Sequence, residues 1–301
     1  MIKGIDVSEM NGIIDFKKVK EDDIEFVMIR ATYGRYKEDK MFKRNIEEAT
    51  KVGLKVGIYY YSYALSIEQA KEEVSNLLKV INPYKDKIKY PVVIDMEDSD
   101  GYKANFGMPS NEVLCDIVRV AGEKISASGY YYMCYANKDW WENKLNVGME
   151  NTPKWLAWWN VEEDKIEKSK YGMWQKTSEG VIKGIGTKVD INFSFVDFEK
   201  LIEYLNNIKK IQYIKLRTGL EDLTIQFMSC YKFGQDLINK IYFRLQDLKK
   251  VTSKDSNLHK AVQKEYGFED KTRVFLEYYL YAEELFLKLY RAICEDTNKC
   301  E

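Results

Sequence analysis

The chain has 301 residues, of which 45% are hydrophobic and 32% are charged, and its net charge is −1 at pH 7. This length allows two domains of ordinary size with a sizeable core. The near-neutral charge argues against a nucleic-acid-binding protein, which normally carries a clear basic excess. No stretch approaches the ~20 apolar residues of a membrane span, so we expect neither nucleic acid nor membrane insertion.

The available chemistry is restricted by a single histidine, His259. Zinc hydrolases need several His ligands, and Ser-His or Cys-His hydrolases need one His as base. His259 lies in a polar helical stretch far from any candidate nucleophile, and we expect it to be exposed. We therefore expect no metal and no cofactor, and any catalysis must depend on carboxylates and tyrosines.

The cysteines are odd in number and contain no CxxC pair, which indicates a reducing compartment without a disulfide framework or a cysteine zinc site. They are Cys115, Cys134, Cys230, Cys294 and Cys300. The N-terminal sequence lacks the apolar segment of a secretory signal, so we expect no signal peptide.

Short segments rich in β-branched and aromatic residues alternate with helical stretches up to about residue 200. The eight predicted strands span residues 3–7, 25–32, 56–63, 90–97, 130–136, 155–160, 171–177 and 189–195. Apolar spacing near 3.6, with Ser before two of the helices and Gly after their ends, predicts helices over 40–53, 66–81 and 110–129. This alternation predicts an α/β fold, a TIM-like β/α barrel. The helical signal fades after residue 137, so the barrel should be irregular in its second half.

The pattern changes after about residue 200, where we expect a linker over 201–218 and a small all-α helical domain over 219–301. Apolar residues at steps of three and four from Leu220 to Leu248 form a helical stripe with heptad character. A short helix is expected over 257–266, ended by Gly267. A second long helix is predicted over about 270–293, with one face formed by Val274, Tyr278, Tyr281, Leu285 and Leu289.

The strand YPVVIDME, residues 90–97, ends in two carboxylates. Side chains two apart share a face of a strand, so Asp95 and Glu97 point the same way above Val93, while Ile94 faces the helices. The carboxyl ends of barrel strands form the active face. Two close acids raise the proton affinity of one of them. One protonated and one ionised acid is the arrangement that glycoside hydrolysis requires.

Acids at matching places in other strands extend this pattern. Asp6 lies near the end of the first strand, and Asp190 lies in the last strand on the same face as Asn192. Four acids from three strands would then meet at one mouth. Clustered acids also bind Mg²⁺ or Ca²⁺, but the neighbouring residues are Tyr and Trp, which suit the flat faces of sugar rings.

Seven motifs in order resemble glycoside hydrolase family 25 over about residues 1–198. They are GIDVSEMNGIIDF, FVMIRATYG, VGIYYYSYAL, YPVVIDME, WLAWW, MWQKTSEG and GIGTKVDINFSF. The family comprises lysozymes (N-acetylmuramidases), often found in bacteriophage endolysins, with an irregular β/α barrel. The resemblance implies a catalytic barrel over 1–200 that cleaves the β-1,4 bond between N-acetylmuramic acid and N-acetylglucosamine in peptidoglycan.

The resemblance also implies roles for individual residues. Glu97 would be the general acid, and Asp95 would assist the acetamido group of the substrate. Asp6 and Asp190 look like supporting acids that orient the sugar. Three further positions would line the cleft: Tyr61, Trp159 and Gln175.

Two positions depart from the family pattern, because Tyr60 stands where many members have His and Tyr63 where many have a basic residue. Substrate contacts are therefore expected to differ in detail. Lysins of this class usually carry a wall-binding domain after the catalytic one, so 219–301 are expected to bind the Gram-positive cell wall. The heptad stripe alternatively indicates a homodimer or higher oligomer, which would add avidity.

The resemblance further implies storage in the bacterial host cytoplasm until lysis, followed by action at the cell wall. Two other functions remain open: a catalytically silent peptidoglycan- or carbohydrate-binding protein on the same barrel, and a metal-dependent phosphoesterase. Retention of all four acids argues against the first, and the aromatic surroundings argue against the second.

Overall fold

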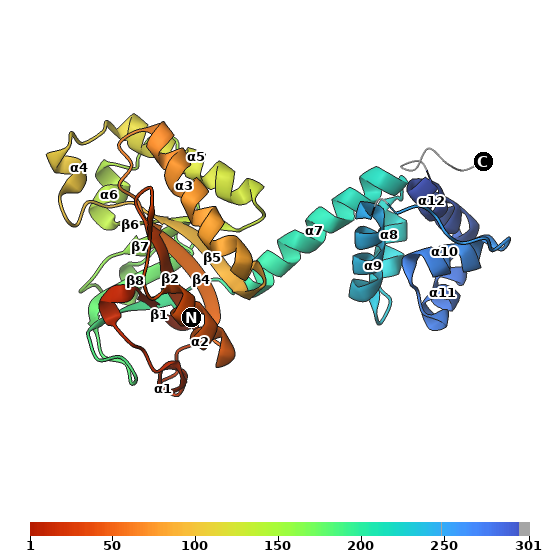
Figure 1. Ribbon diagram of the computed structural model, residues 1–301, viewed down its shortest axis with the longest axis horizontal. Coiled ribbons are helices and arrows are strands. Elements are labelled where there is room, and N and C mark those ends of the chain that lie inside the picture. The colour runs from red at the N-terminus through yellow and green to blue at the C-terminus, as the bar shows by residue number, and fades with distance from the viewer. Residues whose placement is uncertain (248, 295–301) are drawn as a thin grey trace. The chain divides into compact units, whose positions relative to one another are not determined.

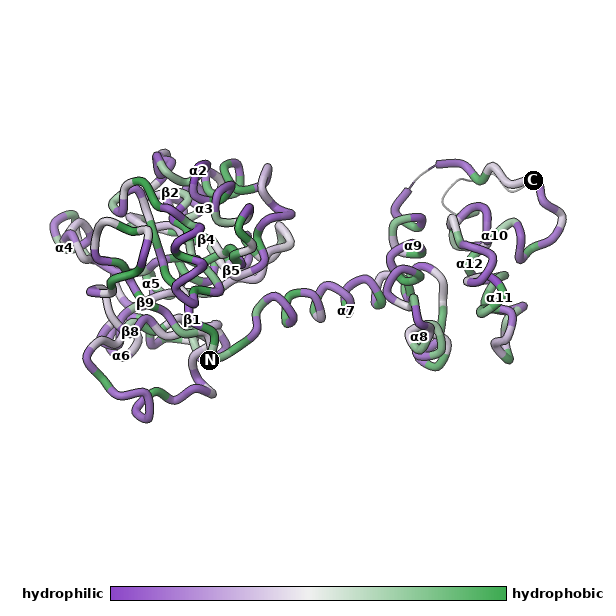
Figure 2. The backbone as a smooth tube through the Cα atoms, turned by 90° about the horizontal axis from the view of Figure 1, so that it is seen from below, coloured by the Kyte–Doolittle hydropathy of each residue, from purple (hydrophilic) through white to green (hydrophobic). Residues whose placement is uncertain are grey.

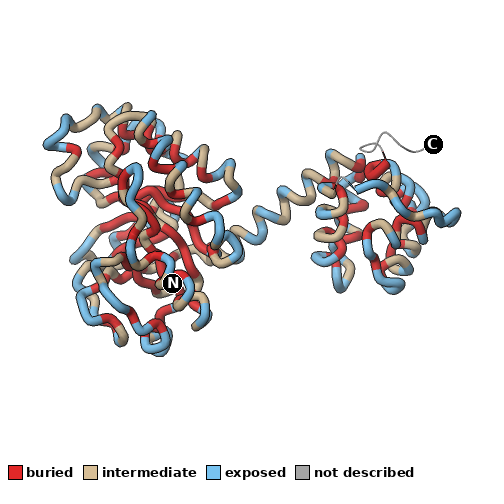
Figure 3. The backbone as a smooth tube through the Cα atoms, in the orientation of Figure 1, coloured by how far each residue is buried: buried red, intermediate tan, exposed pale blue. Residues whose placement is uncertain are grey.

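The chain forms two compact units, residues 1–202 and 203–301. The computed structural model describes residues 1–247 and 249–294 (Figure 1). Each unit has its own buried core, shown in red in Figure 3. Within the described residues no helix is long and apolar enough to cross a membrane.

The first unit is a closed, mixed barrel of eight strands, as predicted. In chain order these are β1 (Ile2–Val7), β2 (Phe26–Tyr33), β4 (Lys55–Tyr61), β5 (Ile88–Asp95), β6 (Tyr132–Asn137), β7 (Lys154–Ala157), β8 (Met173–Gly180) and β9 (Val189–Ser194). The strand order is β1-β9-β8-β7-β6-β5-β4-β2, and parallel pairing of β1 with β2 closes the barrel. A two-residue strand, β3 (Lys37–Glu38), pairs with β2 outside the barrel.

The second half of the barrel is irregular, as the fading helical signal predicted. Only the short helix α6 (Lys138–Asn143) follows β6, and a single 3₁₀ turn (Glu163–Lys165) lies between β7 and β8. β9 runs antiparallel to both of its neighbours, β8 and β1. This reversal brings the amino end of β9 to the same rim as the carboxyl end of β1.

The first half is covered by the three predicted helices, α2 (Phe42–Lys51), α3 (Ile67–Ile81) and α5 (Asn111–Ala127). The hydroxyls of Ser66 and Ser110 accept hydrogen bonds from the first turns of α3 and α5, which satisfies free amide groups there. Shorter helices are α1 (Phe16–Lys20) and α4 (Tyr102–Asn105), and 3₁₀ turns span Glu9–Asn11 and Asn82–Lys87.

Strand β5 separates two cores by alternation. Val92 and Ile94 belong to the layer packed against the helices, whereas Val93 lies inside the barrel with Met133 and Trp155. This is the orientation expected from the period of two, and it directs the Asp95 side chain toward the barrel mouth.

The second unit is helical, as predicted, and hydrophilic residues predominate along α7 (Figure 2). The helices are α7 (Phe198–Thr218), α8 (Asp222–Ser229), α9 (Gly234–Gln246), α10 (Leu258–Tyr266), α11 (Asp270–Glu277) and α12 (Ala282–Cys294). The expected linker, 201–218, lies within α7. The short helix expected over 257–266 is α10, and Gly267 ends it in the left-handed region at φ 65°.

The prediction of two long helices in this unit is wrong, because each predicted helix is broken into two shorter ones. The stripe that begins at Leu220 turns between α8 and α9, where Gly234 lies so close to the Ser229 carbonyl that a Cβ would approach its oxygen to 2.9 Å. A short, folded-back pair allows Met228 and Ile241 to enter one core. Leu248, the last residue of the stripe, lies outside the described residues.

The helix predicted over 270–293 breaks between α11 and α12, and its expected apolar face is only partly buried. Leu285 and Leu289 are buried, whereas Val274, Tyr278 and Tyr281 are exposed. The turn lets Leu276 of α11 and Leu285 of α12 face the same core, which one straight helix would not allow.

The expectation of an exposed His259 is also wrong. Its ring is half-buried and stacks on Phe286 with centroids 4.0 Å apart. Nδ1 lies 3.0 Å from a Glu277 carboxylate oxygen, and Nε2 lies 3.1 Å from one of Glu283. Polar partners on α11 and α12 therefore hold this side chain against the core.

The described cysteines are consistent with the absence of a disulfide framework, because Cys115, Cys134 and Cys230 form no disulfide. Cys300 lies outside the described residues.

Candidate active site

A cavity of about 280 Å³ lies at the rim where β1, β4 and β5 end and β9 begins. All seven residues predicted for the site line it: Asp6, Tyr61, Asp95, Glu97, Trp159, Gln175 and Asp190. Acids from three separate strands therefore converge on one cavity, as the sequence predicted. Five further residues line the same cavity: Arg30, Tyr59, Ser99, Tyr135 and Trp155.

Asp95 and Glu97 lie at the end of β5, and burial raises the pKa of both. Glu97 lies just beyond the strand and is half-buried, and loss of solvent raises its pKa to about 7. Asp95 is 7% exposed, and burial together with the Glu97 charge raises its pKa well above the usual range. Two acids that compete for protons in this way divide into one protonated and one ionised group at neutral pH.

Asp6 and Asp190 are register partners on β1 and β9 and share a hydrogen bond. Burial, together with the Asp6 charge, raises the pKa of Asp190 to about 8. Asp6 Oδ2 also accepts hydrogen bonds from Gln175 Nε2 at 2.9 Å and from Asn192 Nδ2 at 2.7 Å. Burial raises the pKa of Asp6, whereas the hydrogen bonds from Asn192, Gln175 and Asp190 lower it. Amide donors favour an ionised acceptor, so we assign Asp6 as the carboxylate and Asp190 as the proton donor of this pair.

Amide and indole side chains connect Asp6 to the cavity wall. Gln175 Oε1 accepts from Tyr135 Oη at 2.9 Å and from Trp159 Nε1 at 3.0 Å. On the other side, Trp155 Nε1 donates to Asn192 Oδ1 at 3.0 Å. These bonds fix the orientation of both amides, because each amide oxygen already accepts an N–H or O–H.

Tyr61 also lines the cavity and is joined to the loop after β5. Its hydroxyl lies 3.1 Å from Ser99 Oγ and accepts a hydrogen bond from the Ser99 amide at 3.1 Å. This pair anchors the loop that carries Glu97. Rings continue outward from Tyr61 through Tyr63 and Tyr102, with successive centroids 4.9 and 4.8 Å apart.

A buried lysine lies beneath the acid pair. Lys103 of α4 is fully buried, and its Nζ donates to the carbonyl of Glu97 at 2.7 Å and to the carbonyl of Ser62. Burial lowers the pKa of Lys103, while the charges of Asp95 and Glu73 oppose that shift. The lysine ties the end of β4 to the Glu97 backbone, and its charge lowers the pKa of Glu97 against the effect of burial.

The loop before α4 brings Lys103 to this position. Gly101 adopts φ 71°, a conformation that glycine tolerates best, and begins the helix. Asp98 then accepts hydrogen bonds from the amides of Lys103 and Ala104 at 2.6 and 2.9 Å. The sequence DSDG after the acid pair carried this turn signal, but nothing in the sequence predicted that Lys103 is buried.

Several lining residues were missed by sequence reasoning. Arg30 interrupts the apolar strand β2, which is a visible signal, and its Nε donates to Asp39 at 2.8 Å. Tyr135 and Trp155 lie in predicted strands, and both are buried core residues that also face the cavity.

The two departures from the family pattern lie in different surroundings. Tyr60 is fully buried in the layer facing the helices and does not line the cavity. The Tyr63 hydroxyl donates to Asp100 at 2.7 Å beside the ring of Tyr61. A change in substrate contacts is therefore expected at Tyr63 and not at Tyr60. Among the described residues, no group of His, Cys, Asp and Glu side chains is arranged to hold a metal ion.

Comparison with known proteins places this barrel in a family. The chain is 26% identical over 191 residues to the autolytic lysozyme of Clostridium acetobutylicum, covering 64% of this chain and 55% of the relative. It therefore spans about half the length of that relative.

Solved structures share the barrel. The modular autolysin LytC of Streptococcus pneumoniae, in complex with a synthetic peptidoglycan ligand, matches with a TM-score of 0.57 and 26% identity, over 63% of this chain and 46% of that one. The catalytic domain of endolysin ply40 from bacteriophage P40 of Listeria monocytogenes has the same fold, with a TM-score of 0.56 and 22% identity, over 67% of this chain and 97% of that one. The pattern of glycosyl hydrolases family 25 matches residues 5–185, so this chain belongs to that family.

Proposed function

We propose that this chain is a muramidase that hydrolyses the β-1,4 bond between N-acetylmuramic acid and N-acetylglucosamine in peptidoglycan. The observation that carries the proposal is Glu97, half-buried at the cavity with a pKa raised to about 7, beside the more deeply buried Asp95. A carboxyl group of this kind is protonated often enough at neutral pH to act as a general acid. Membership of family 25 supports the same activity.

In the proposed reaction, Glu97 gives its proton to the glycosidic oxygen as the bond from the anomeric carbon to that oxygen breaks. The carbonyl oxygen of the substrate's own acetamido group bonds to the anomeric carbon, and Asp95 accepts the acetamido N–H and stabilises its developing positive charge. We assign the one proton shared by the pair to Glu97, because the Lys103 charge acts more strongly on Asp95 than on Glu97 and favours ionised Asp95 against the effect of its burial. Water then attacks the anomeric carbon, the bond from that carbon to the acetamido oxygen breaks, and the proton of the water returns to Glu97. Substrate assistance of this kind does not depend on the separation of the two carboxylates.

The ordered side chains around Asp6 support sugar positioning. Asp6, held by Gln175 and Asn192, is an ionised acceptor for substrate hydroxyls. Trp159 is 47% exposed at the cavity, so its indole face is available to the apolar face of a sugar ring.

The experiment is to compare wild type with Glu97→Gln on purified peptidoglycan and to measure reducing ends released. Glutamine keeps the shape of the side chain and cannot donate the catalytic proton, so release should fall by about 10²–10⁴-fold. Glu123→Gln, an exposed change on α5, is the matched control and should retain full activity. Full activity in Glu97→Gln refutes the assignment, and an inactive wild type favours a silent carbohydrate-binding protein.

We also propose a phage-type endolysin in which the helical unit binds the Gram-positive cell wall or forms an oligomer. Family 25 membership of the barrel and the presence of a second, separate unit support this arrangement. Sedimentation of the full chain with walls of several Gram-positive species, together with its mass in solution, tests both roles.

A further inference from the structure

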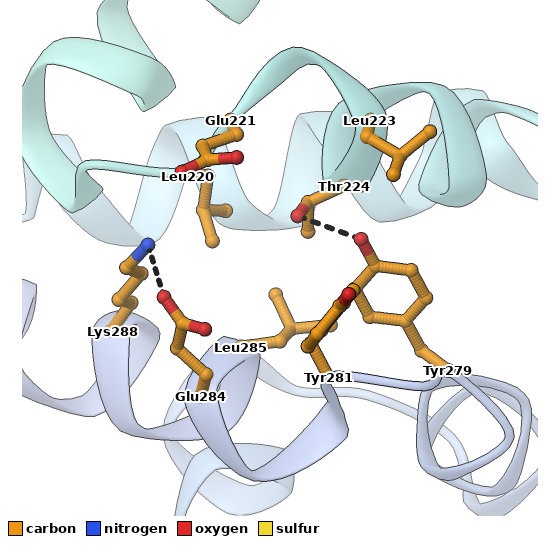
Figure 4. A pocket seen from close by; sticks show the side chains of 9 residues that line it. All are labelled: Leu220, Glu221, Leu223, Thr224, Tyr279, Tyr281, Glu284, Leu285 and Lys288. Atoms are coloured by element: carbon orange, nitrogen blue, oxygen red, sulfur yellow. Dashed lines mark hydrogen bonds and ion pairs between the residues drawn. The ribbon is translucent and has the colours of Figure 1, made fainter.

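The helical unit contains a cavity of about 300 Å³ between the start of α8 and the start of α12 (Figure 4). It is lined by Leu220, Glu221, Leu223, Thr224, Tyr279 and Tyr281, together with three residues of α12, Glu284, Leu285 and Lys288. All of these residues belong to the second unit, so the cavity is independent of the barrel site.

The floor of this cavity is apolar and its wall is aromatic. Leu220 and Leu285 are buried at its base, and Tyr281 stands at its side with 51% of its surface exposed. The Tyr281 ring packs edge-on against Tyr279, with centroids 5.7 Å apart and planes inclined by 72°. The Tyr279 hydroxyl is in turn held by Thr224 Oγ1 at 3.0 Å. Tyr281 is therefore a supported ring with one accessible face.

The rim of the cavity is polar. Glu284 and Lys288 form an ion pair at 2.6 Å on α12, and Glu221 faces them from the turn before α8 (Figure 4). The rim carries two carboxylates and one lysine, and the lysine is already paired with Glu284. The rim therefore accepts hydrogen bonds and is unfavourable to an anion. Hydroxyl and amide N–H groups are the donors that suit such a rim.

These features together specify the ligand class. The volume lies at the lower end of the range for small-molecule sites, about 300–1,000 Å³, which suits a single ring. A pyranose offers an apolar face to Tyr281, hydroxyls to the carboxylates and an N-acetyl methyl group to the leucines. A phosphate-bearing wall polymer would place negative charge against Glu221 and Glu284.

We propose that this cavity binds one N-acetylated hexosamine residue of the cell-wall glycan. The proposal rests on the proposed function, because a muramidase that cleaves the same glycan gains avidity from a second sugar site on its helical unit. Two large lining side chains support a binding role, because they remain exposed to solvent at the cavity: Leu223 is 62% and Tyr281 is 51% exposed.

The test uses the full chain in a Glu97→Gln background, so that the wall is not degraded. Sedimentation with purified walls stripped of phosphate polymers gives the wall concentration for half-maximal binding. Tyr281→Ala should raise that concentration about tenfold, the usual effect of removing a central aromatic contact. Leu223→Ala, at another exposed lining position, should weaken binding in the same direction. Tyr278→Ala, in the same connection but outside the cavity, is the matched control and should bind like the parent.

Free N-acetylglucosamine should compete for the wall in the parent and lose much of its effect in Tyr281→Ala, whereas inorganic phosphate should not compete. The proposal is overturned if Tyr281→Ala binds like the parent or if Tyr278→Ala loses as much. It is equally overturned if phosphate competes, or if Tyr281→Ala instead halves the mass of the chain in solution, which would identify a second copy as the occupant. Reducing ends released by wild type from soluble glycan fragments test the muramidase proposal separately, since that readout does not require wall binding.

Discussion

The buried lysine beneath the acid pair leads to a prediction about the pH profile of catalysis. Cleavage requires protonated Glu97, so activity should fall as pH rises through about 7. Lys103 lowers the pKa of both Glu97 and Asp95. Removing its charge should therefore raise both values and move the whole bell-shaped profile to higher pH.

The magnitude follows from the burial of the group. An opposite charge within about 4–6 Å of a carboxylate shifts its pKa by about 1–3 units. We expect the lower end of that range, about one unit or 1.4 kcal/mol, because Lys103 Nζ bonds to the Glu97 carbonyl and not to its carboxylate. Lys103→Met should thus move the alkaline limb from about 7 to about 8.

The same substitution should reduce stability, because the carbonyls of Ser62 and Glu97 lose their donor. Each buried acceptor left unpaired costs about 1–3 kcal/mol, and loss of the lysine's own desolvation penalty offsets part of this. Lys103→Gln is the companion variant, since its amide can still donate while the charge is gone. It should show the pH shift with a smaller fall in melting temperature.

The assay is initial release of reducing ends from peptidoglycan between pH 4 and 10, with thermal unfolding of each variant measured in parallel. A folded Lys103→Gln variant whose alkaline limb coincides with that of wild type would refute the electrostatic role. A profile that keeps its position but loses height would assign to Lys103 a purely structural role.

Three further predictions test other parts of the molecule. Gln175→Glu removes the amide donor to Asp6 and adds a like charge, so kcat/KM should fall at least tenfold. Circular dichroism should show an intact fold, and unchanged kinetics would contradict the role of this network. Trp159→Ala should raise KM more than it lowers kcat, because its exposed ring contacts sugar in ground and transition states alike; an effect on kcat alone would argue against this. Gly57→Ala would place a Cβ 2.9 Å from the Cβ of Tyr90 inside the barrel. Denaturant unfolding should show a loss of about 1–3 kcal/mol in the free energy of unfolding. Gly186→Ala, which has open space around the added Cβ, should leave that free energy unchanged.

The local elements of the barrel could be predicted because their signals are local. Alternation along 90–97 places Val93 inside the barrel and Ile94 against the helices, as observed. The Ser caps and Gly267 mark helix ends through hydrogen bonds and backbone conformations that involve only nearby residues. The acids at the mouth were predicted for the same reason, since an acid at the end of an apolar strand is visible in one segment.

The helical unit shows where such reasoning fails. A stripe of apolar residues predicts which face of a helix is buried, but it does not predict whether the stripe belongs to one straight helix or to two helices joined by a turn. The breaks before Gly234 and Ala282 arise because folded-back pairs bury both halves of each stripe in one core. His259 was misplaced for a similar reason, because the Phe286 ring and the carboxylates that contact it come from two later helices, α11 and α12.

The sequence by itself therefore determined the eight strands, the helices that cover the first half of the barrel and the acids at the rim. Only the tertiary structure decided that β9 runs antiparallel, so that Asp190 meets Asp6, and that Lys103 is buried beneath Glu97. The physical reason is that periodicity and capping depend on neighbours along the chain. The pKa of a carboxylate depends on which distant side chains bury it, and the point where a helix turns depends on which distant side chains share its core.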